Sequence, residues 1–225
     1  MEVVLWLLLT CIIFWGAFYL YKKTKSNLLL PVFVTSAVVV VLLIIFNVSY
    51  ESYFQGAQYI DQFLGPAIVA LSFPLYVHRR KLVKHFLMIA GWLLFAAVAT
   101  MTLGTVFFYA NGYELELLVS LLLKNTTAPI AIELSNIYGG MPSFSAVMVT
   151  FAGMSGAILG PYLFKWSKIE HPLAKGISMG AISHAIGTAR VMDEDEEAGA
   201  ISTVSFLIMA IMTTALMPLF VFWYQ

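Results

Sequence analysis

One stretch of the chain, from Gly176 to Arg190, places an ionisable side chain among residues that interrupt helices. His184 lies inside an apolar run, next to Ser183 and close to Gly187 and Thr188. Ionisable groups within membrane helices are costly and mark solute or proton paths by default. His184 is therefore a candidate partner for an anionic substrate or a proton relay. The alternative is a core histidine bonded to a neighbouring carbonyl.

Two further segments combine helix-breaking and polar residues. Residues 124–133 read Lys-Asn-Thr-Thr-Ala-Pro-Ile-Ala-Ile-Glu, and residues 61–76 contain Gly65, Pro66 and Pro74. Proline removes a backbone donor and disturbs the preceding helical turn. In hydrocarbon such breaks survive only where protein or water covers them, and half-helix N-termini there can bind anions. A single kink is common in membrane helices, but three polar breaks predict a substrate pathway.

Two charged residues near these breaks each have two interpretations. Arg190 could clamp a carboxylate through its guanidinium, or pair with Asp193 and Glu194 along a helix. Glu133 could exchange a coupling proton, as could His184, or it could cap a helix at the interface. The candidate substrate-binding residues are Asn125, Thr126, Thr127, Pro129, Ser183, His184, Gly187, Thr188 and Arg190, with Gly65 and Pro66 opposite them.

Soluble-enzyme motifs do not accompany these residues. The chain has no P-loop, GxSxG, HExxH or CxxC motif. Ser183 and His184 are adjacent, and sequence neighbours seldom adopt triad geometry. The four histidines and the single cysteine lack metal-ligand spacing. We therefore expect neither catalysis nor a metal or cofactor.

The composition is that of a membrane protein. Of the 225 residues, 61% are hydrophobic and 11% charged, and the mean hydropathy is +0.90. Soluble domains carry roughly 25% charged residues, and a soluble fold of this length could not cover so much apolar surface. The zero net charge gives no indication of a nucleic-acid partner. The predicted fold class is an all-α polytopic protein of the lipid bilayer.

Apolar stretches of about 20 residues predict the spanning helices. Uncharged stretches are Val3–Tyr21, Ser26–Tyr50, Phe86–Tyr113, Leu134–Phe164 and Ala198–Gln225; more interrupted ones are Ala57–Val77, Leu115–Ser135 and Pro172–Arg190. We count about seven or eight membrane segments. They form a single domain, 1–225, in which 1–56 is a two-helix scaffold and 57–225 a core with broken helices near 61–76, 124–135 and 176–190.

Lysine and arginine clusters predict the orientation. The predicted loops Lys22–Lys25 and Arg79–Lys84 are the most basic, and Asn47–Gln55 between them has neither residue type. The N-terminus is then expected outside and His78–Lys84 in the cytoplasm.

The lysines between residues 165 and 175 are also expected in the cytoplasm. This requires Leu115–Gly140 to enter and leave the membrane on the same side, as a re-entrant hairpin does. Pro172–Arg190 would then run antiparallel to Ala57–Val77, as in the inverted repeats of transporters.

The residues at these breaks resemble the LrgB/CidB family of bacterial membrane proteins. The most specific stretch is Ser-His-Ala-Ile-Gly-Thr-Ala-Arg at 183–190, followed by Glu-Glu-Ala-Gly-Ala-Ile-Ser at 196–202. Similar motifs occur at 65–76, 126–131, 139–143, 156–161 and 174–176. Ala185 stands where the family has glycine, and Asn125 where serine is usual.

This resemblance implies two functions. Family members are described as holin- or antiholin-like modulators of murein hydrolase activity and lysis, beside a smaller LrgA/CidA-like membrane protein. A plastid relative looks like a glycolate/glycerate translocator, and bacterial pairs are linked to pyruvate uptake. Together with the broken helices, this predicts a secondary transporter of small monocarboxylates (glycolate, glycerate, pyruvate or lactate) in the bacterial cytoplasmic membrane, forming a homo-oligomer such as a dimer. The alternative is an antiholin-like regulator that oligomerises with the LrgA/CidA-like partner.

Overall fold

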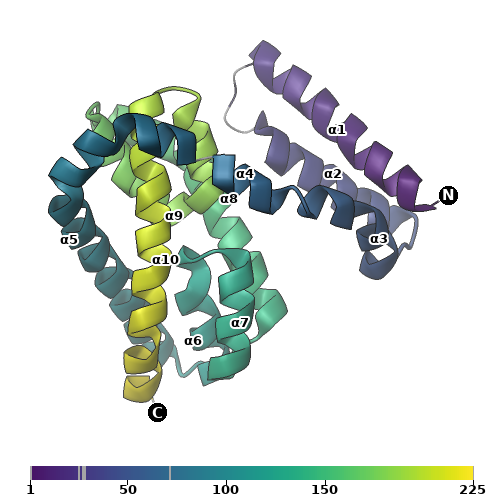
Figure 1. Ribbon diagram of the computed structural model, residues 1–225. Coiled ribbons are helices and arrows are strands. Elements are labelled where there is room, and N and C mark those ends of the chain that lie inside the picture. Colours follow the sequence, from purple (N-terminus) through teal and green to yellow (C-terminus); the bar gives the residue numbers. More distant parts are fainter. Residues whose placement is uncertain (1, 25, 27–28, 71, 225) are drawn as a thin grey trace. The chain divides into compact units, whose positions relative to one another are not determined.

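The computed structural model describes residues 2–24, 26, 29–70 and 72–224. It divides into two compact units, Met1–Ser72 and Phe73–Gln225, which are described separately. Within the described residues every regular element is a helix, so the predicted all-helical class is confirmed (Figure 1). Leu71, inside the predicted break at 61–76, and two residues of the predicted span Ser26–Tyr50 lie outside the described part.

The first unit contains four helices: α1 (Glu2–Thr24), α2 (Pro31–Ile45), α3 (Tyr50–Asp61) and α4 (Leu64–Ala70). Proline begins α2, where its missing amide costs no helical bond, and the Ser49 side chain accepts a hydrogen bond from the Ser52 amide to cap α3. Helix α1 packs against α2 and α3. A Cβ on Gly56 of α3 would lie 2.5 Å from the Val3 carbonyl oxygen, so this crossing requires glycine.

Four helices are long and apolar enough to cross a membrane: Val3–Thr24, Phe73–Asn111, Pro142–Trp166 and Glu196–Trp223. They confirm four of the predicted spans, with two corrections. The cluster Arg79–Lys84 is not a loop but part of α5 (Ser72–Asn111), because lysine and arginine are good helix formers. The predicted span Leu134–Phe164 begins later, at Pro142 of α8 (Pro142–Trp166), because Gly139 ends the preceding helix with a left-handed cap.

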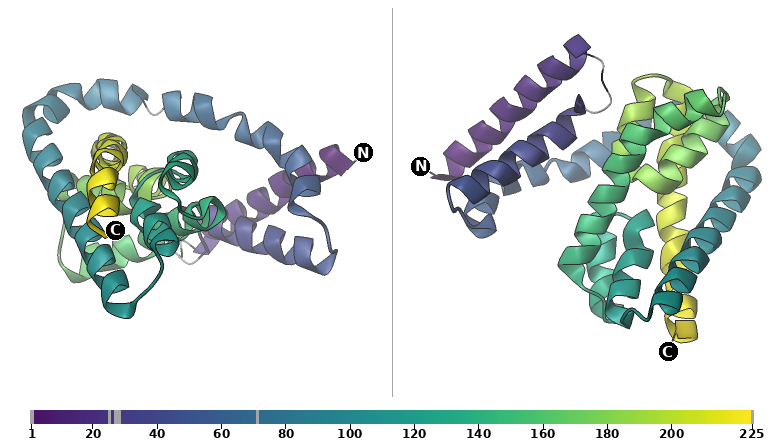
Figure 2. Two further views of the ribbon diagram at one scale, coloured as in Figure 1. Left: turned by 90° about the horizontal axis from the view of Figure 1, so that it is seen from below. Right: turned by 180° about the vertical axis from the view of Figure 1, so that it is seen from behind.

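Two short helices separate α5 from α8. Helix α6 (Leu115–Leu122) continues into the 3-10 turn η2 (Leu123–Asn125), and α7 (Ala128–Tyr138) follows two extended residues. At 1.5 Å per residue α6 and α7 are about 12 and 16 Å long, roughly half of a bilayer core. Figures 1 and 2 show α6 leaving the end of the unit where α5 finishes, and α7 returning to that end. We call residues 115–138 the first hairpin; it lies within Leu115–Gly140, where the sequence predicts a re-entrant segment, and its membrane topology stays a prediction.

Helix α9 (Pro172–Met192) also reverses direction, at His184, where φ is 47° and ψ is −137°. On its first arm, 172–183, Gly176 packs on Ala198 and Gly180 on Ser202 of α10 (Glu196–Tyr224). On its second arm, 185–192, the order along α10 is opposite: a Cβ on Gly199 would touch Met192, whereas Thr188 bonds Ser202. Residues 172–192 therefore form a second hairpin.

The two hairpins enter the second unit from opposite ends. The first begins where α5 ends, and the second begins after the end of α8, close to the start of α10 (Figure 1). An ion pair between Lys81, in the third turn of α5, and Glu197, in the first turn of α10, joins the two helices at that end. Because α9 reverses, the predicted antiparallel relation between Pro172–Arg190 and Ala57–Val77 does not apply to it.

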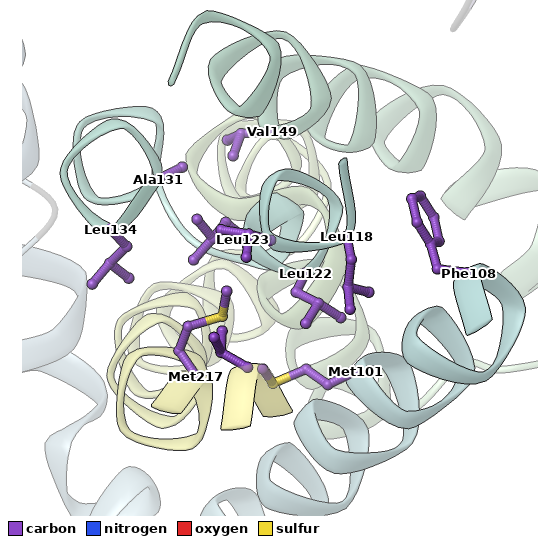
Figure 3. Packing of buried hydrophobic residues seen from close by; sticks show 11 residues of the cluster. Met101, Phe108, Leu118, Leu122, Leu123, Ala131, Leu134, Val149 and Met217 are labelled. Atoms are coloured by element: carbon purple, nitrogen blue, oxygen red, sulfur yellow. The ribbon is translucent and has the colours of Figure 1, made fainter. Parts of the chain in front are cut away.

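The first hairpin is enclosed by protein. Leu118, Leu122 and Leu123 are essentially inaccessible, and Figure 3 shows them at the centre of a cluster. The surrounding side chains come from α5, α7, α8 and α10: Met101, Phe108, Ala131, Leu134, Val149 and Met217. A chain break at membrane depth is tolerated where protein covers it, and this cluster provides that cover.

Candidate functional site

The tips of the two hairpins meet at a buried hydrogen bond. His184 Nε2 lies 2.7 Å from the Lys124 carbonyl oxygen, although sixty residues separate them in sequence. A carbonyl can only accept, so Nε2 carries the proton and donates. The imidazole is 5% exposed. The bond to a carbonyl matches the alternative expected for a core histidine, but this carbonyl belongs to the other hairpin, so the ring joins the two breaks.

Two polar side chains of the first tip, residues 123–127, donate hydrogen bonds to protein groups. Asn125 Nδ2 donates to Thr100 Oγ1 at 2.9 Å, while Thr100 donates its own proton to the Ala96 carbonyl. Thr126, 1% exposed, donates to the Leu123 carbonyl at 2.7 Å. Thr127 caps α7, and Pro129 lies exposed in its first turn. Sequence analysis missed Thr100, because nothing in a long apolar helix marks the one threonine that meets a distant loop.

The second tip, residues 183–188, has a different hydrogen-bond pattern. Thr188 Oγ1 donates to the His184 carbonyl at 2.7 Å and lies 2.7 Å from Ser202 Oγ on α10. Since the threonine proton is used, Ser202 must donate to Thr188. Among the described residues, Ser183 Oγ and His184 Nδ1 are buried without a hydrogen-bond partner. Such groups in a native fold indicate a functional or ligand-binding role.

Gly187 is required by the second turn. A Cβ there would lie 2.2 Å from the Cβ of Ser183. The glycine therefore lets the two arms of α9 approach each other directly beyond His184.

A cavity of about 690 Å³ lies between α5, α9 and α10 and extends along the first arm of α9. His171 precedes that arm, and His85 follows Lys81 by one turn of α5, so both histidines lie at the end where α9 begins. Thr100, Asn125 and Ser178 are the polar residues deeper in the cavity. The remaining lining is apolar: Met88, Trp92, Phe95, Ala96, Leu173, Ala174, Ile177, Ala181, Ile182 and Met209.

A smaller cavity of about 400 Å³ lies on the other side of the same arm, between α8 and α9. Ser183, Ser155 and Gly156 line it. A Cβ on Gly156 would lie 1.9 Å from Ser183 Oγ, so the serine packs directly on the α8 backbone. The predicted residues are therefore divided: Asn125 faces the large cavity and Ser183 the small one.

Two predicted residues of the second unit, Arg190 and Glu133, lie apart from the tip contact. Arg190 forms an ion pair with Glu194, the local pairing that sequence spacing offered as an alternative. Glu133 is exposed on α7. Gly65 and Pro66 lie exposed in α4, which belongs to the first unit. In the described ranges no cluster of histidine, cysteine or acidic residues could hold a metal ion.

Comparisons with known proteins cover nearly the whole chain. The model of the LrgB-like family matches residues 10–223. A protein of Bacillus subtilis described as "Uncharacterized protein YxaC" is 40% identical over 215 residues, 96% of this chain and 94% of its own length. A Staphylococcus aureus protein named "Holin-like protein CidB" is 30% identical over 220 residues, 98% of this chain and 96% of its own. No solved structure matches the chain.

Proposed function

The chain belongs to the LrgB-like family of multi-pass membrane proteins, and from this premise we propose that it is a secondary transporter of small monocarboxylates such as glycolate, glycerate, pyruvate or lactate. The observation that carries the proposal is the contact between two hairpin tips that enter from opposite ends, His184 Nε2 to the Lys124 carbonyl. Broken helices meeting in the protein interior are the usual construction of carrier sites.

The order of the elements supports an inverted repeat in the second unit. Helix α5 is followed by a hairpin from one end, and α8 by a hairpin from the other. With α2 and the two hairpins added to the four long helices, the chain has about seven membrane segments. In this proposal the end carrying Arg79–Lys84 and the lysines of 165–175 faces the cytoplasm, as the positive-inside rule requires. The outside location of the N-terminus remains a prediction.

The large cavity is the proposed path from that end to the tips. One N–H of the Asn125 amide is engaged by Thr100 and the other remains for a carboxylate oxygen. Thr126 and Thr127 lie at the start of α7, whose positive dipole end favours an anion. Ser183, Gly187 and Thr188 shape the second tip, and a proton on His184 Nδ1 would add positive charge.

More distant residues keep supporting roles in the proposal. A carboxylate clamp by Arg190 would require exchange of its Glu194 partner. Glu133 could pass a coupling proton only at the surface of α7. Gly65, Pro66 and Pro129 remain predicted contributors to the pathway.

The test is uptake of labelled glycolate, pyruvate and lactate into proteoliposomes, with and without an imposed pH gradient. We expect saturable uptake by the wild type and none above protein-free vesicles for His184→Ala, because the tips lose their connecting side chain. His78→Ala is the matched control, since His78 lies on α5 outside both cavities and should transport normally. Uptake by His184→Ala at the wild-type rate would place the site elsewhere.

The second candidate function is an antiholin-like regulator of murein hydrolase activity and lysis, acting as an oligomer with an LrgA/CidA-like partner. The name of the Staphylococcus aureus relative, "Holin-like protein CidB", favours this function. Proteoliposomes filled with a membrane-impermeant dye separate the two. A carrier retains the dye and transports acids, whereas a regulator without a solute path retains the dye and transports no acid, with or without the added partner. Release of the dye would instead indicate a holin-like lesion.

A further inference from the structure

The lining of the large cavity indicates which acids it accommodates best. Building on the proposed transport function, we propose that the preferred substrates are monocarboxylates with an apolar tail, such as branched-chain 2-oxo acids, rather than two- or three-carbon hydroxy acids. Within the described residues His85 and His171 lie at one end and Thr100 and Asn125 at the other, while Ser178 and the indole N–H of Trp92 are the polar groups along the apolar wall between them. An amphipathic acid matches this division.

Volume is the first argument. The cavity measures about 690 Å³, and pockets of roughly 300–1,000 Å³ commonly hold drug-sized ligands against mainly apolar walls. Glycolate or pyruvate would fill a small part of it and leave the rest to water. Small side chains on the first arm of α9, Ala174 and Ala181, provide this width opposite Trp92 of α5.

The chemistry of the wall is the second argument. Beside Ala181 and Met209, which are 4% and 1% exposed, lie Ile177 and the edge-to-face pair Trp92 and Phe95, whose ring centroids are 5.9 Å apart. Apart from the indole N–H of Trp92, these side chains offer no hydrogen bond to the 2- and 3-hydroxyl groups of glycerate. A polar group buried there without a partner lowers affinity, whereas added methyl groups gain it.

The orientation of the substrate follows from the two ends. The second N–H of the Asn125 amide can donate to a carboxylate near the first tip. The tail then extends along the α9 arm between Trp92 and Met209. At the opposite end His171, whose Nδ1 accepts a hydrogen bond from the Leu173 amide, has its Nε2–H to donate to the entering anion.

A substrate series in proteoliposomes tests this inference. Uptake of labelled pyruvate is compared with that of 3-methyl-2-oxobutanoate and 4-methyl-2-oxopentanoate, which share its head group and differ only in the tail. We expect the KM to fall about tenfold from pyruvate to the six-carbon acid, because each buried methylene is worth at least several-fold in a fitted pocket. An equal or higher KM for the longer acids would overturn the preference while leaving monocarboxylate transport intact. No uptake of any acid would instead contradict the proposed function.

Filling the cavity provides the second readout. Ala174→Phe places a ring in the widened region and should raise the KM for 4-methyl-2-oxopentanoate at least tenfold, with the KM for pyruvate changed less than twofold. Ala146→Phe adds the same volume on α8, away from both cavities, and should affect neither acid. The milder Ala174→Leu serves if the phenylalanine variant does not elute as a folded protein. Equal losses for both acids in the Ala174 variants would overturn the assigned position of the tail.

Discussion

The two hairpin tips both interrupt a helix inside the protein, but they differ in how their polar groups are hydrogen-bonded. The first interrupts a helix with several residues, and its amide and hydroxyl groups are engaged by α5 or by its own backbone. The second interrupts a helix at the single residue His184, and leaves Ser183 Oγ and His184 Nδ1 buried without partners among the described residues. Both are enclosed in protein, so burial alone does not decide which groups are satisfied.

This difference indicates a division of roles. A tip whose Asn125 and Thr126 side chains are held by protein groups is the more fixed support, whereas buried polar groups without a partner are costly and require an explanation, such as a function. The positive φ of His184 adds conformational strain, which also concentrates at functional sites. The second tip is therefore the part expected to change on substrate binding, and the following variants test that contrast.

The largest expected effect comes from the packing beneath each tip. Gly180→Ala on α9 would place a Cβ 2.5 Å from the Ser202 backbone carbonyl, so α10 itself must shift. Gly140→Ala after α7 would meet only side chains, the nearest being Val119 Cγ1 at 2.7 Å. We expect a loss of about 3 kcal/mol or more for Gly180→Ala and less for Gly140→Ala, measured as thermal stability in detergent. Similar losses of stability in the two variants would argue against a difference in rigidity between the packing of the two hairpins.

The hydroxyl groups of the tips give the next effect. Thr188→Val leaves the Ser202 hydroxyl and the His184 carbonyl without their partner, which should cost about 2 kcal/mol and most of the uptake. Thr126→Val removes only a bond to its own turn and should cost about 1 kcal/mol with uptake retained.

Serines on α10 provide the control for this pair. Ser202→Ala should reproduce the Thr188→Val loss of uptake, whereas Ser205→Ala should not, since Ser205 bonds only the Ile201 carbonyl of its own helix. Equal uptake by the two serine variants would show that the bridge to α10 does not position the second tip.

A smaller effect separates strain from hydrogen bonding at His184. Both His184→Gly and His184→Ala lose the imidazole, but only glycine adopts a φ of 47° without steric cost. The glycine variant should be more stable than the alanine variant by about 1 kcal/mol, with neither active in uptake. The unfolding temperatures of the two purified variants measure this, and a more stable alanine variant would argue against strain at the second tip.

The smallest effect concerns the ion pair beyond the second tip. Glu194→Arg alone should cost about 0.5 kcal/mol, the usual value for an exposed partner, and Arg190→Glu more, because the Arg190 side chain is only 10% exposed. The double exchange should restore stability. If uptake returns as well, Arg190 acts only through Glu194; if the stable double variant remains inactive, the guanidinium at this position binds substrate.

Sequence patterns predicted the helix breaks better than they predicted the distant residues that form hydrogen bonds with them. Pro129 and Gly187 mark interruptions by residue type alone, and the cationic residues at 165–175 required a re-entrant segment near 115–140. The bond from His184 to the Lys124 carbonyl joins residues far apart in the chain, so no local pattern contains it. Thr100 and Ser202 were missed as site residues for the same reason. The reversal at His184 was not foreseen either, because Ala185 replaces the family's glycine and left-handed conformations are uncommon for histidine.

The burial of α6 also bears on how the protein is synthesised. This helix is too short to insert as a conventional span, and its central position depends on Met217 of α10, which leaves the ribosome later. Until α10 arrives, part of the first hairpin has no protein cover in the hydrocarbon, where uncovered backbone groups are costly. Membrane insertion of this hairpin should therefore be completed late, and nascent chains that stop before residue 196 should leave it accessible to water-soluble labelling reagents.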